Sequence, residues 1–444
     1  MTGRHHKGEL SGTEPASNVE SHPVDQPRFA QPEPMPDPGK FRILHGSDTA
    51  AYQELDSLQR LHELRPLPFP ISRGGEEPVL TLQEVLGLDG GKAVGAISKA
   101  GQIVFHAVGD TGNVRSVKPQ NEVADKMVSD FNETDPKDVP AFFFHLGDVV
   151  YSFGESKYYY DQFYEPYRDY PRPIFSIAGN HDGMVAPGNT VPPLKAFRDN
   201  FCATGLHQTP DAGGLDRTAM IQPGVYFTLD APFVRILSLY SNALEDPGVI
   251  SSQGGTVPEL SDVQLDFLRA ALKRVRSEEF QGAVIIAVHH PPYTTFSKHS
   301  GSPLMLKALD AISLETGVWP HAVLSGHAHN YQRFTRATQG MEIPYVIAGN
   351  GGHAVAPLQK KGQPPLRVPM QLPQHQQGKD RVALESYDDQ DYGYLRILVN
   401  SKQLRIEYHP ASDGAGAKTP DDSVTVDLES RKVVHFQSQI PQQK

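Results

Sequence analysis

The chain has 444 residues, of which 38% are hydrophobic, and its formal net charge is −11 at pH 7. This length allows a large buried core and more than one domain, whereas the acidic balance and the lack of a basic stripe argue against a nucleic-acid surface. The single cysteine, Cys202, excludes an intrachain disulfide.

No stretch of the sequence approaches the ~20 consecutive apolar residues of a membrane span. The first forty residues lack the apolar region of a secretory signal. We therefore expect a cytoplasmic protein that does not insert into a membrane. The sequence leaves its oligomeric state open.

The two ends of the chain are predicted to be tails. Residues 1–40 are rich in Pro, Glu, Gln and Ser and contain almost no apolar clusters, so they cannot bury enough surface to offset the loss of chain entropy. We expect a disordered segment there, with His5, His6 and His22 solvated. Residues 431–444 are expected to form a C-terminal tail.

Residues 41–100 are predicted to form an accessory segment that packs on the main domain. A short helix is expected over residues 49–65, because apolar side chains recur there at helical spacing. These side chains are Tyr52, Leu55, Leu58 and Leu61. Residues 78–89 fit either a helix or a strand.

A main domain is predicted over residues 101–430, where short apolar runs alternate with helical stretches. Near-continuous apolar runs of this length are typical of strands that are covered on both faces. Strands are predicted over residues 102–108, 141–146, 173–178, 283–288 and 322–325.

Two helices are predicted between these strands. The helix over 261–276 is expected to begin with a capping box formed by Ser261 and Gln264. The next helix is expected to begin with Ser302 as its cap and Pro303 in its first turn. The side chains predicted to be buried are Leu265, Leu268, Leu272 and Val275 on the first helix, and Met305, Ala308, Leu309 and Ile312 on the second.

Antiparallel strands are also predicted. The sequence pattern predicts two strands over residues 225–239 and a hairpin over residues 393–409. The Pro- and Gln-rich stretch over 355–390 is expected to be a long loop. Together these patterns predict an α/β sandwich of mixed sheets flanked by helices.

Polar side chains follow the end of each of the five predicted buried strands. Because the carboxyl ends of neighbouring strands converge on one crevice in open α/β sheets, these side chains are expected to meet. Taken singly, most of the motifs fit an ordinary turn at a strand end, but five of them in one crevice do not. The motifs are Gly109-Asp110-Thr111-Gly112, Gly147-Asp148 with Tyr151, Gly179-Asn180-His181-Asp182, His289-His290, and Gly326-His327-Ala328-His329.

The types of side chain in these motifs indicate metal binding. Asp, Asn, His and Tyr without Cys favour hard or borderline cations such as iron, zinc and manganese. Seven ligands exceed one tetrahedral site, so two metal ions are expected, roughly 3.5–4 Å apart and sharing a carboxylate. Such a pair would make bound water reactive and hold both oxygens of a displacement at phosphorus.

The five motifs together resemble those of the calcineurin-like metallophosphoesterases, and within them the purple acid phosphatase branch. They extend from about residue 105 to residue 330, and the helix 261–276 and the segment Ala348–Gly352 also fit the family. The resemblance does not cover residues 1–100 or 355–390. It implies a four-layer α/β/β/α sandwich of two mixed sheets flanked by helices, of the metallo-dependent phosphatase type.

The resemblance also implies a role for each ligand. The first metal would be held by Asp110, Asp148, Tyr151 and His329. The second would be held by Asp148, which bridges the two ions, and by Asn180, His289 and His327. The histidine that many relatives have two positions after the first aspartate is absent, because Gly112 occupies that position.

Tyr151 has the spacing of the ligating tyrosine of purple acid phosphatases, and a phenolate favours Fe(III). The expected centre is therefore Fe(III) with Zn, Mn or Fe(II). Metal charge of about +5 against about −3 from Asp110, Asp148 and Tyr151 would leave about +2 to attract a phosphate dianion.

The implied activity is the hydrolysis of small-molecule phosphate esters, in the manner of an acid phosphatase, by metal-activated hydroxide. His181 would stabilise charge on the transferred phosphoryl group. His299 lies where the family often has a histidine that protonates the leaving group, although a solvated loop histidine fits its spacing equally well. A phosphodiesterase with Mn or Zn and a non-catalytic scaffold remain as alternatives.

Overall fold

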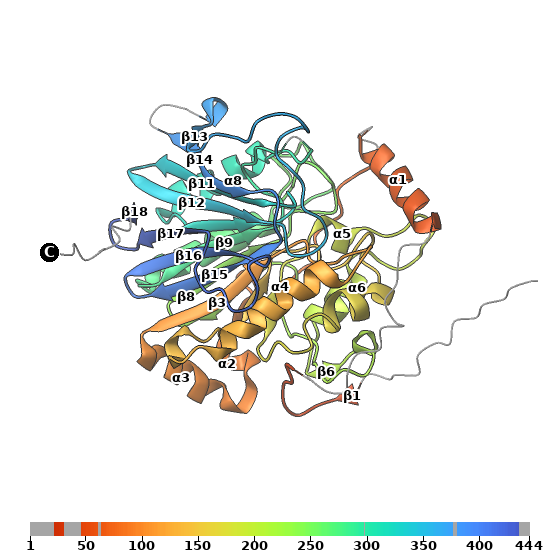
Figure 1. Cartoon of the computed structure of the whole chain (residues 1–444), viewed down its shortest axis with the longest axis horizontal. Helices are drawn as coiled ribbons and strands as arrows, with labels where there is room; N and C mark the ends of the chain where they lie inside the picture. Colours follow the sequence, from red (N-terminus) through yellow and green to blue (C-terminus); the bar gives the residue numbers. More distant parts are fainter. Residues whose placement is uncertain (1–21, 31–45, 61–63, 297, 376–379, 435–444) are drawn as a thin grey trace, which may run out of the picture.

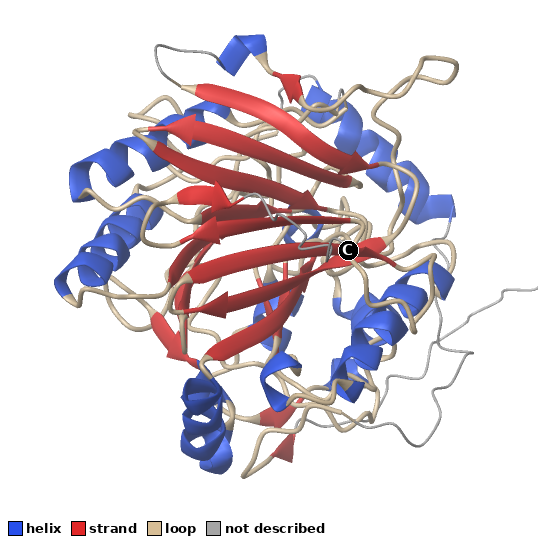
Figure 2. Cartoon of the chain, turned by 60° about the vertical axis from the view of Figure 1, so that its left-hand side comes forward, coloured by secondary structure: helices blue, strands red, loops and turns tan. Residues whose placement is uncertain are grey.

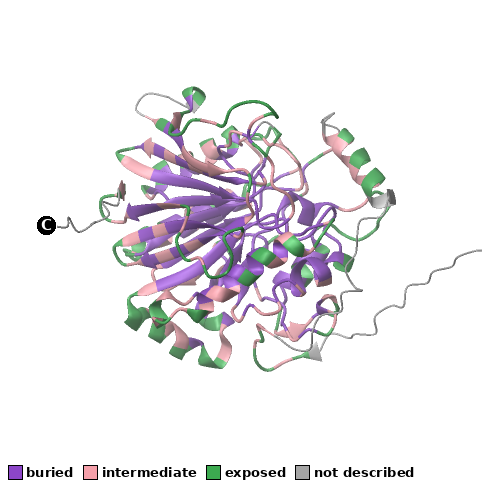
Figure 3. Ribbon diagram, in the orientation of Figure 1, coloured by how far each residue is buried: buried purple, intermediate pink, exposed green. Residues whose placement is uncertain are grey.

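The computed structural model of the chain describes residues 22–30, 46–60, 64–296, 298–375 and 380–434. Within this part of the chain, two mixed β-sheets form the centre and helices lie around them (Figures 1 and 2). The strands are mostly buried, whereas the helices expose their outer sides (Figure 3). The predicted four-layer α/β/β/α sandwich of two mixed sheets is confirmed.

The larger sheet has nine strands in the order β13-β14-β11-β12-β10-β9-β8-β7-β2. Strands β8, β9, β10 and β12 run parallel, and β11 pairs antiparallel with both β12 and β14. The strands are β2 (Val79–Thr81), β7 (Phe227–Ala231), β8 (Val234–Leu239), β9 (Ala283–Val288), β10 (Ala322–Ser325), β11 (Tyr331–Thr338), β12 (Met341–Ala348), β13 (Met370–Gln371) and β14 (Arg381–Asp388).

The smaller sheet has seven strands in the order β18-β17-β16-β15-β3-β4-β5. Strands β3, β4 and β5 are parallel neighbours, and β15 pairs antiparallel with β3. The strands are β3 (Gln102–Val108), β4 (Phe143–His145), β5 (Ile174–Ser176), β15 (Gly393–Asn400), β16 (Gln403–Pro410), β17 (Asp422–Asp427) and β18 (Lys432–Val434).

The helices connect the strands and cover the sheets. They are α1 (Gly46–Arg60), α2 (Leu82–Val85), α3 (Gly90–Ala100), α4 (Lys118–Ser129), α5 (Asn180–Gly183), α6 (Lys195–Phe201), α7 (Val263–Ser277) and α8 (Pro303–Thr316). None of the described helices combines the length and the apolar character needed to cross a lipid bilayer.

Most of the two predicted tails lies outside the described residues, including His5 and His6, but the parts that are described pack on the domain. Residues 22–30 do not form a free tail: β1 (His22–Pro23) pairs with β6 (His207–Gln208), and Phe29 packs against the core. At the other end, β18 adds an outer strand beside β17. Backbone pairing and one aromatic side chain hold these short pieces in place.

Several predicted elements agree with the structure. The strands predicted over 102–108, 283–288 and 322–325 match β3, β9 and β10 residue for residue. The stretch 225–239 forms the antiparallel pair β7 and β8, and 393–409 forms the hairpin of β15 and β16. The segment that fitted either a helix or a strand contains both, because β2 leads directly into α2.

The predicted capping box of α7 does not form. The cap residue is Asp262, and it makes no side-chain capping bond. Gln264 is fully buried instead: it accepts a hydrogen bond from the Tyr240 backbone N–H at 2.8 Å and donates one to the Tyr240 carbonyl at 2.9 Å. Tertiary contact with the end of β8 therefore outweighs the local capping motif. The buried face of α7 also differs from the prediction, because Phe267 is buried and Leu265 is only half-buried.

The second helix start was also predicted incorrectly in one respect. Ser302 precedes α8 as its cap residue, but its hydroxyl accepts a hydrogen bond from the Gly248 backbone N–H at 2.9 Å rather than from the helix. Pro303 is in the first turn, and Met305, Leu309 and Ile312 are buried as predicted. Ala308, which was also predicted to be buried, is only half-buried.

The predicted loop over 355–390 is interrupted by the short strand β13 and is too long at its C-terminal end. Residues Arg381–Asp388 form β14, which pairs with β11 along most of its length. Only Val382, Ala383 and Leu384 of this strand are buried, and its other side chains are half-buried or exposed. The apolar signal of this outer strand is correspondingly short, which explains why the sequence pattern did not reveal it.

The ends of the buried strands converge at one edge of the sandwich, but they come from both sheets. Three of them, β3, β4 and β5, belong to the smaller sheet, and β9 and β10 belong to the larger one. The aromatic core anchors this arrangement: Phe142, just before β4, stacks on Phe105 at 4.7 Å and meets Phe175 edge-on at 5.5 Å. The single crevice predicted for one open sheet is thus a junction between two sheets.

Candidate metal centre

Sharp backbone turns aim the polar side chains into the junction. Asp110, Asp148 and His327 have φ angles of 56°, 54° and 69°, in the left-handed region that non-glycine residues seldom adopt. Each of these residues directly follows a glycine at the end of a strand. Backbone strain of this kind is typical of functional sites.

Two glycines allow the strand ends to approach one another closely. A Cβ atom at Gly179 would overlap Oδ1 of Asp148, and one at Gly326 would lie 2.5 Å from Oδ2 of Asp110. Neither position tolerates a side chain without displacing a carboxylate. The two glycines therefore matter for the distance between strand ends and not only for the turn.

The first group of side chains surrounds the hydroxyl of Tyr151. This oxygen lies 2.9 Å from Oδ1 of Asp110, 2.9 Å from Oδ2 of Asp148 and 3.4 Å from Nε2 of His329. A single phenol proton can be donated to only one of these atoms. All four side chains predicted to hold the first metal are therefore brought together around one point.

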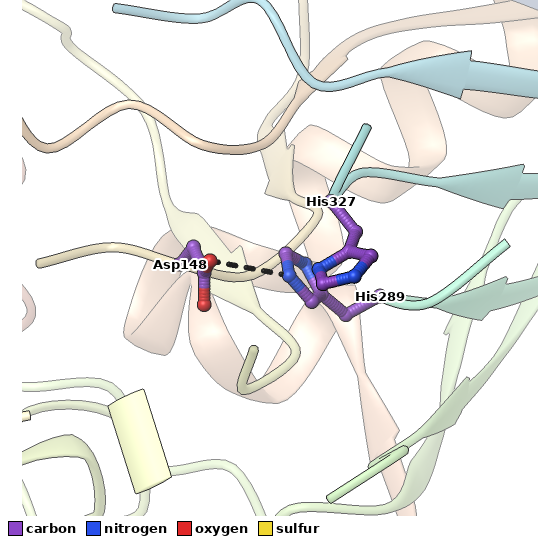
Figure 4. Close-up of side chains that lie close together, drawn as sticks. All are labelled: Asp148, His289 and His327. Carbon is purple, nitrogen blue, oxygen red and sulfur yellow. Dashed lines mark ion pairs between the residues drawn. The ribbon is translucent and has the colours of Figure 1, made fainter. Parts of the chain in front are cut away.

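The second group is centred on Asn180. Its Oδ1 lies 3.1 Å from Nε2 of His289 and 3.1 Å from Nδ1 of His327, and Nε2 of His289 lies 3.3 Å from Oδ2 of Asp148. Figure 4 shows the carboxylate of Asp148 facing the two imidazoles. His289 and His327 follow β9 and β10 of the other sheet. The four side chains predicted to hold the second metal also meet, and Asp148 belongs to both groups.

Hydrogen bonds behind the site fix the orientation of these side chains. Nδ1 of His289 donates to the Leu146 carbonyl at 2.8 Å, which leaves Nε2 to face the carboxylates. Asp182 accepts from the backbone N–H groups of Val149 and Gly179, at 3.1 and 2.8 Å, and so links the turns after β4 and β5. Such supporting partners are typical of metal ligands.

The donor set fits a pair of cations. The donor atoms lie about 2.9–3.4 Å apart, which is close to the separation of ligands that share an ion at about 2.1 Å. Asp148, His289 and His327 could hold one metal ion by this geometry.

Charges within the site perturb its ionisable groups strongly. Burial alone would raise the pKa of Asp148, but the neighbouring His289 and His181 outweigh it and hold the pKa well below its usual range. Burial would lower the pKa of His289, but Asp148 and Asp110 raise it to about 10. A proton on His289 thus balances the acids in the absence of a cation, and metal binding has to displace it.

A cavity of about 100 Å³ opens in front of these side chains. Both predicted catalytic histidines, His181 and His299, line it. Nδ1 of His181 donates to the Ser152 carbonyl at 2.7 Å, and its backbone N–H donates to Oδ1 of Asp148 at 2.9 Å. The ring of His299 lies 4.2 Å from the ring of His327. His299 is therefore not the solvated loop histidine that its spacing also allowed.

His290 belongs to the support of the site and does not line the cavity. It is fully buried, with Nδ1 2.7 Å from the Ser241 hydroxyl and Nε2 2.8 Å from the Leu244 carbonyl. It therefore fixes the loop after β8, which carries Glu245 into the cavity.

Sequence reasoning did not single out four of the residues that line the cavity: Tyr52, Ser152, Glu245 and His353. His353 stacks on Tyr151 with ring centroids 3.6 Å apart, and a strand followed by a glycine-rich turn precedes it, as at the other sites. Tyr52 was assigned to the apolar face of a helix, but its hydroxyl donates to Oε1 of Glu245 at 2.8 Å. No local motif distinguishes Glu245.

Comparison with known proteins identifies a family to which the chain is similar. The family model of the calcineurin-like phosphoesterases matches residues 103–331, just over half of the chain, and this region includes all five strand-end motifs. Over 294 residues, 62% of the chain, the sequence is 24% identical to "Probable inactive purple acid phosphatase 9" of Arabidopsis thaliana. The chain spans only 42% of the length of that relative.

Two solved structures are also similar to this chain. A purple acid phosphatase from seeds of yellow lupin (Lupinus luteus) is 17% identical, with 73% of this chain and 54% of that chain covered and a TM-score of 0.49. GAP50 of the inner membrane complex of Plasmodium is 12% identical, with 74% of this chain and 91% of that chain covered and a TM-score of 0.49.

Proposed function

The chain belongs to the calcineurin-like phosphoesterase family, and we propose on this basis that it hydrolyses phosphate monoesters at a dinuclear metal centre of the purple acid phosphatase kind. The observation that carries the proposal is the convergence of seven donor side chains from five strand ends of two sheets. These donors are Asp110, Asp148, Tyr151, Asn180, His289, His327 and His329.

The proposed centre is Fe(III) paired with Zn, Mn or Fe(II). Asp110, Tyr151 and His329 would hold the Fe(III), because two of them are hard anionic oxygen donors. Asn180, His289 and His327 would hold the divalent ion, with Asp148 shared between the two. When bound, such a pair lowers the pKa of water and offsets negative charge on the phosphoryl group.

The histidines that line the cavity would then act on the substrate. The bond from Nδ1 of His181 to Ser152 leaves Nε2 as the atom able to contact a phosphoryl oxygen. His299 enters the cavity from the opposite loop, and we assign it the proton that the departing alkoxide takes up. One water is consumed, the ester P–O bond breaks, and inorganic phosphate and an alcohol are released.

The proposal is tested with protein reconstituted with iron and zinc. We expect hydrolysis of p-nitrophenyl phosphate to exceed that of bis(p-nitrophenyl) phosphate. We expect Asp148→Ala to abolish both turnover and metal binding, because it removes the shared carboxylate. Glu429→Ala, at an exposed acid remote from the site, is the matched control. Metal content and turnover that survive Asp148→Ala would refute the proposal.

The name of the Arabidopsis relative favours a second candidate, a non-catalytic member of the family that binds metal or a partner without turnover. In that case the reconstituted protein would hold two metal ions and hydrolyse neither substrate. A third outcome, faster cleavage of the diester, would indicate a phosphodiesterase with Mn or Zn.

A further inference from the structure

Two neighbouring carboxylates lie beside the imidazoles of the cavity, and the first of them, Glu245, is part of the cavity wall. They belong to Glu245 and Asp246, in the loop between β8 and α7. Oε1 of Glu245 lies 3.7 Å from Nε2 of His181, and the two oxygens of Asp246 lie 3.8 Å from Nε2 of His327 and 3.7 Å from Nδ1 of His299. The loop thus places negative charge beside the groups proposed to contact substrate.

The two acids are held in these positions. The Tyr52 hydroxyl donates to Oε1 of Glu245 at 2.8 Å, which ties helix α1 to the cavity. The backbone N–H of Ser300 donates to Oδ1 of Asp246 at 2.9 Å. Their side chains are only 16% and 24% exposed. Solvent screening of their charge is therefore weaker than at an open surface.

Other polar atoms at the same place lack partners. His327 is 1% exposed, and its Nε2, which points towards Asp246, has no hydrogen-bond partner in the described structure; nor does Nδ1 of His299. Among the described residues that line the cavity there is no Lys or Arg. A polar ligand group that enters here would meet acceptors and imidazoles but no fixed cation from the protein.

The acids change the charge balance of the site. Glu245 and Asp246 add about two negative charges beside the imidazoles of His181, His299 and His327. This negative charge lies near the place that a leaving group would occupy. A substrate with a second anionic group would be repelled, whereas one with a cationic group could pair with the two carboxylates.

We propose that Glu245 and Asp246 select phosphate monoesters whose short leaving group carries a cation, such as a protonated amine. This inference rests on the proposed function and specifies its substrate class. The size of the cavity, about 100 Å³, favours a short leaving group. The amine would lie against the carboxylates while the phosphate lies against the proposed metal ligands.

Three esters of nearly equal size test the charge preference: phosphoethanolamine, 2-hydroxyethyl phosphate and 2-phosphoglycolate. Each reacts with one water to give phosphate and ethanolamine, ethylene glycol or glycolate. They differ mainly in the charge at the far end, which is positive, neutral or negative. We expect kcat/KM of the metal-loaded wild type to fall in that order, with phosphoethanolamine about tenfold or more above 2-phosphoglycolate.

Variants locate the cause of the preference. Glu245→Gln and Asp246→Asn should each lower the ratio of kcat/KM between phosphoethanolamine and 2-phosphoglycolate about threefold or more. Glu245→Asp keeps the charge and should retain most of the ratio, and Glu429→Gln should leave it unchanged. Circular dichroism and metal content establish that each variant is folded and loaded with metal. A lower kcat/KM ratio in a variant then results from the lost carboxylate charge.

The two proposals fail in different ways. Suppose that p-nitrophenyl phosphate is hydrolysed, but the kcat/KM ratio is near one in the wild type, or both variants keep the wild-type ratio. The charge preference is then wrong and the proposed function stands. If no phosphoester is hydrolysed, the proposed function is wrong. Calorimetric affinities of the same three esters for the metal-loaded chain then decide the charge preference, which equal affinities would overturn.

Discussion

The hydroxyl of Tyr151 lies 2.9 Å from Oδ2 of Asp148, three residues earlier in the chain. It is equally close to Oδ1 of Asp110, from a different strand, and His353 stacks on its ring. One phenol cannot donate to both carboxylates, so the arrangement leaves an excess of negative oxygen at one point. A cation of high charge would resolve that excess, and this relationship underlies the first prediction.

Tyr151→Phe is expected to remove a visible absorption band while iron is retained. Burial raises the pKa of the Tyr151 phenol well above its usual value, and Asp110 and Asp148 add to the shift. The metal-free protein should therefore show no phenolate absorption from this residue at neutral pH, and the band should appear when Fe(III) is added. Absorption spectra with parallel iron analysis make the test. An iron-containing, colourless wild type would rule out Tyr151 as a ligand.

Metal removal is expected to destabilise the fold. The acids and imidazoles meet in a largely buried junction. A cation that binds only the native state adds to the free energy of unfolding, by about 4 kcal/mol when free metal is about a thousand times the Kd. Thermal unfolding with and without a chelator measures the difference. Asp148→Asn should abolish most of the metal-dependent increase in Tm. A chelator that leaves the wild-type Tm unchanged would contradict a metal-stabilised junction.

Gly179→Ala is expected to lose metal and to destabilise the protein by about 1–3 kcal/mol, the usual cost of overpacking a buried site. The added methyl group would overlap the Asp148 carboxylate, and the backbone at Gly179 has a negative φ, so the effect is steric. Gly95→Ala is the matched control. It lies in α3 with open space around it, and it should be neutral or stabilise by about 0.5–1 kcal/mol. Equal metal content in the two variants would show that the close approach at Gly179 is not required.

Glu407→Gln is expected to destabilise the protein more at neutral pH than in acid. Burial would raise the pKa of the Glu407 carboxyl, but its bonds to His409 and Arg405 and the charge of Arg396 outweigh burial and lower the pKa from 4.5 to about 2. A depressed carboxyl pKa contributes stability above the unfolded value, and this contribution is lost as pH falls from about 4.5 towards 2.

The expected loss is about 3 kcal/mol at pH 7, from the size of the shift. Urea unfolding of wild type and variant between pH 7 and pH 3 should therefore give curves that converge in acid. Glu429→Gln, at an exposed acid, should run parallel to the wild type across this range. If the free energies of unfolding of the wild type and Glu407→Gln differ by the same amount at every pH, packing and not charge is responsible.

Local pattern accounts for much of the agreement between sequence and structure. The apolar runs of β3, β9 and β10 are buried along almost their whole length, so side-chain hydrophobicity alone marks their bounds. The polar residues after β3, β4, β5, β9 and β10 also predicted the donor set, because the ends of these strands were expected to meet. The roles of those donors in metal binding remain predictions.

The contacts between distant segments were decided by the tertiary structure alone. Gln264 does not form the predicted capping box, because its side chain makes two buried hydrogen bonds with the backbone of Tyr240. Tyr52 and Glu245 meet from positions almost two hundred residues apart, and neither carries a signal in its own segment. Sequence periodicity records which face of an element is apolar, but the packing of two sheets determines which loops lie opposite one another, and that packing places Glu245 in the cavity.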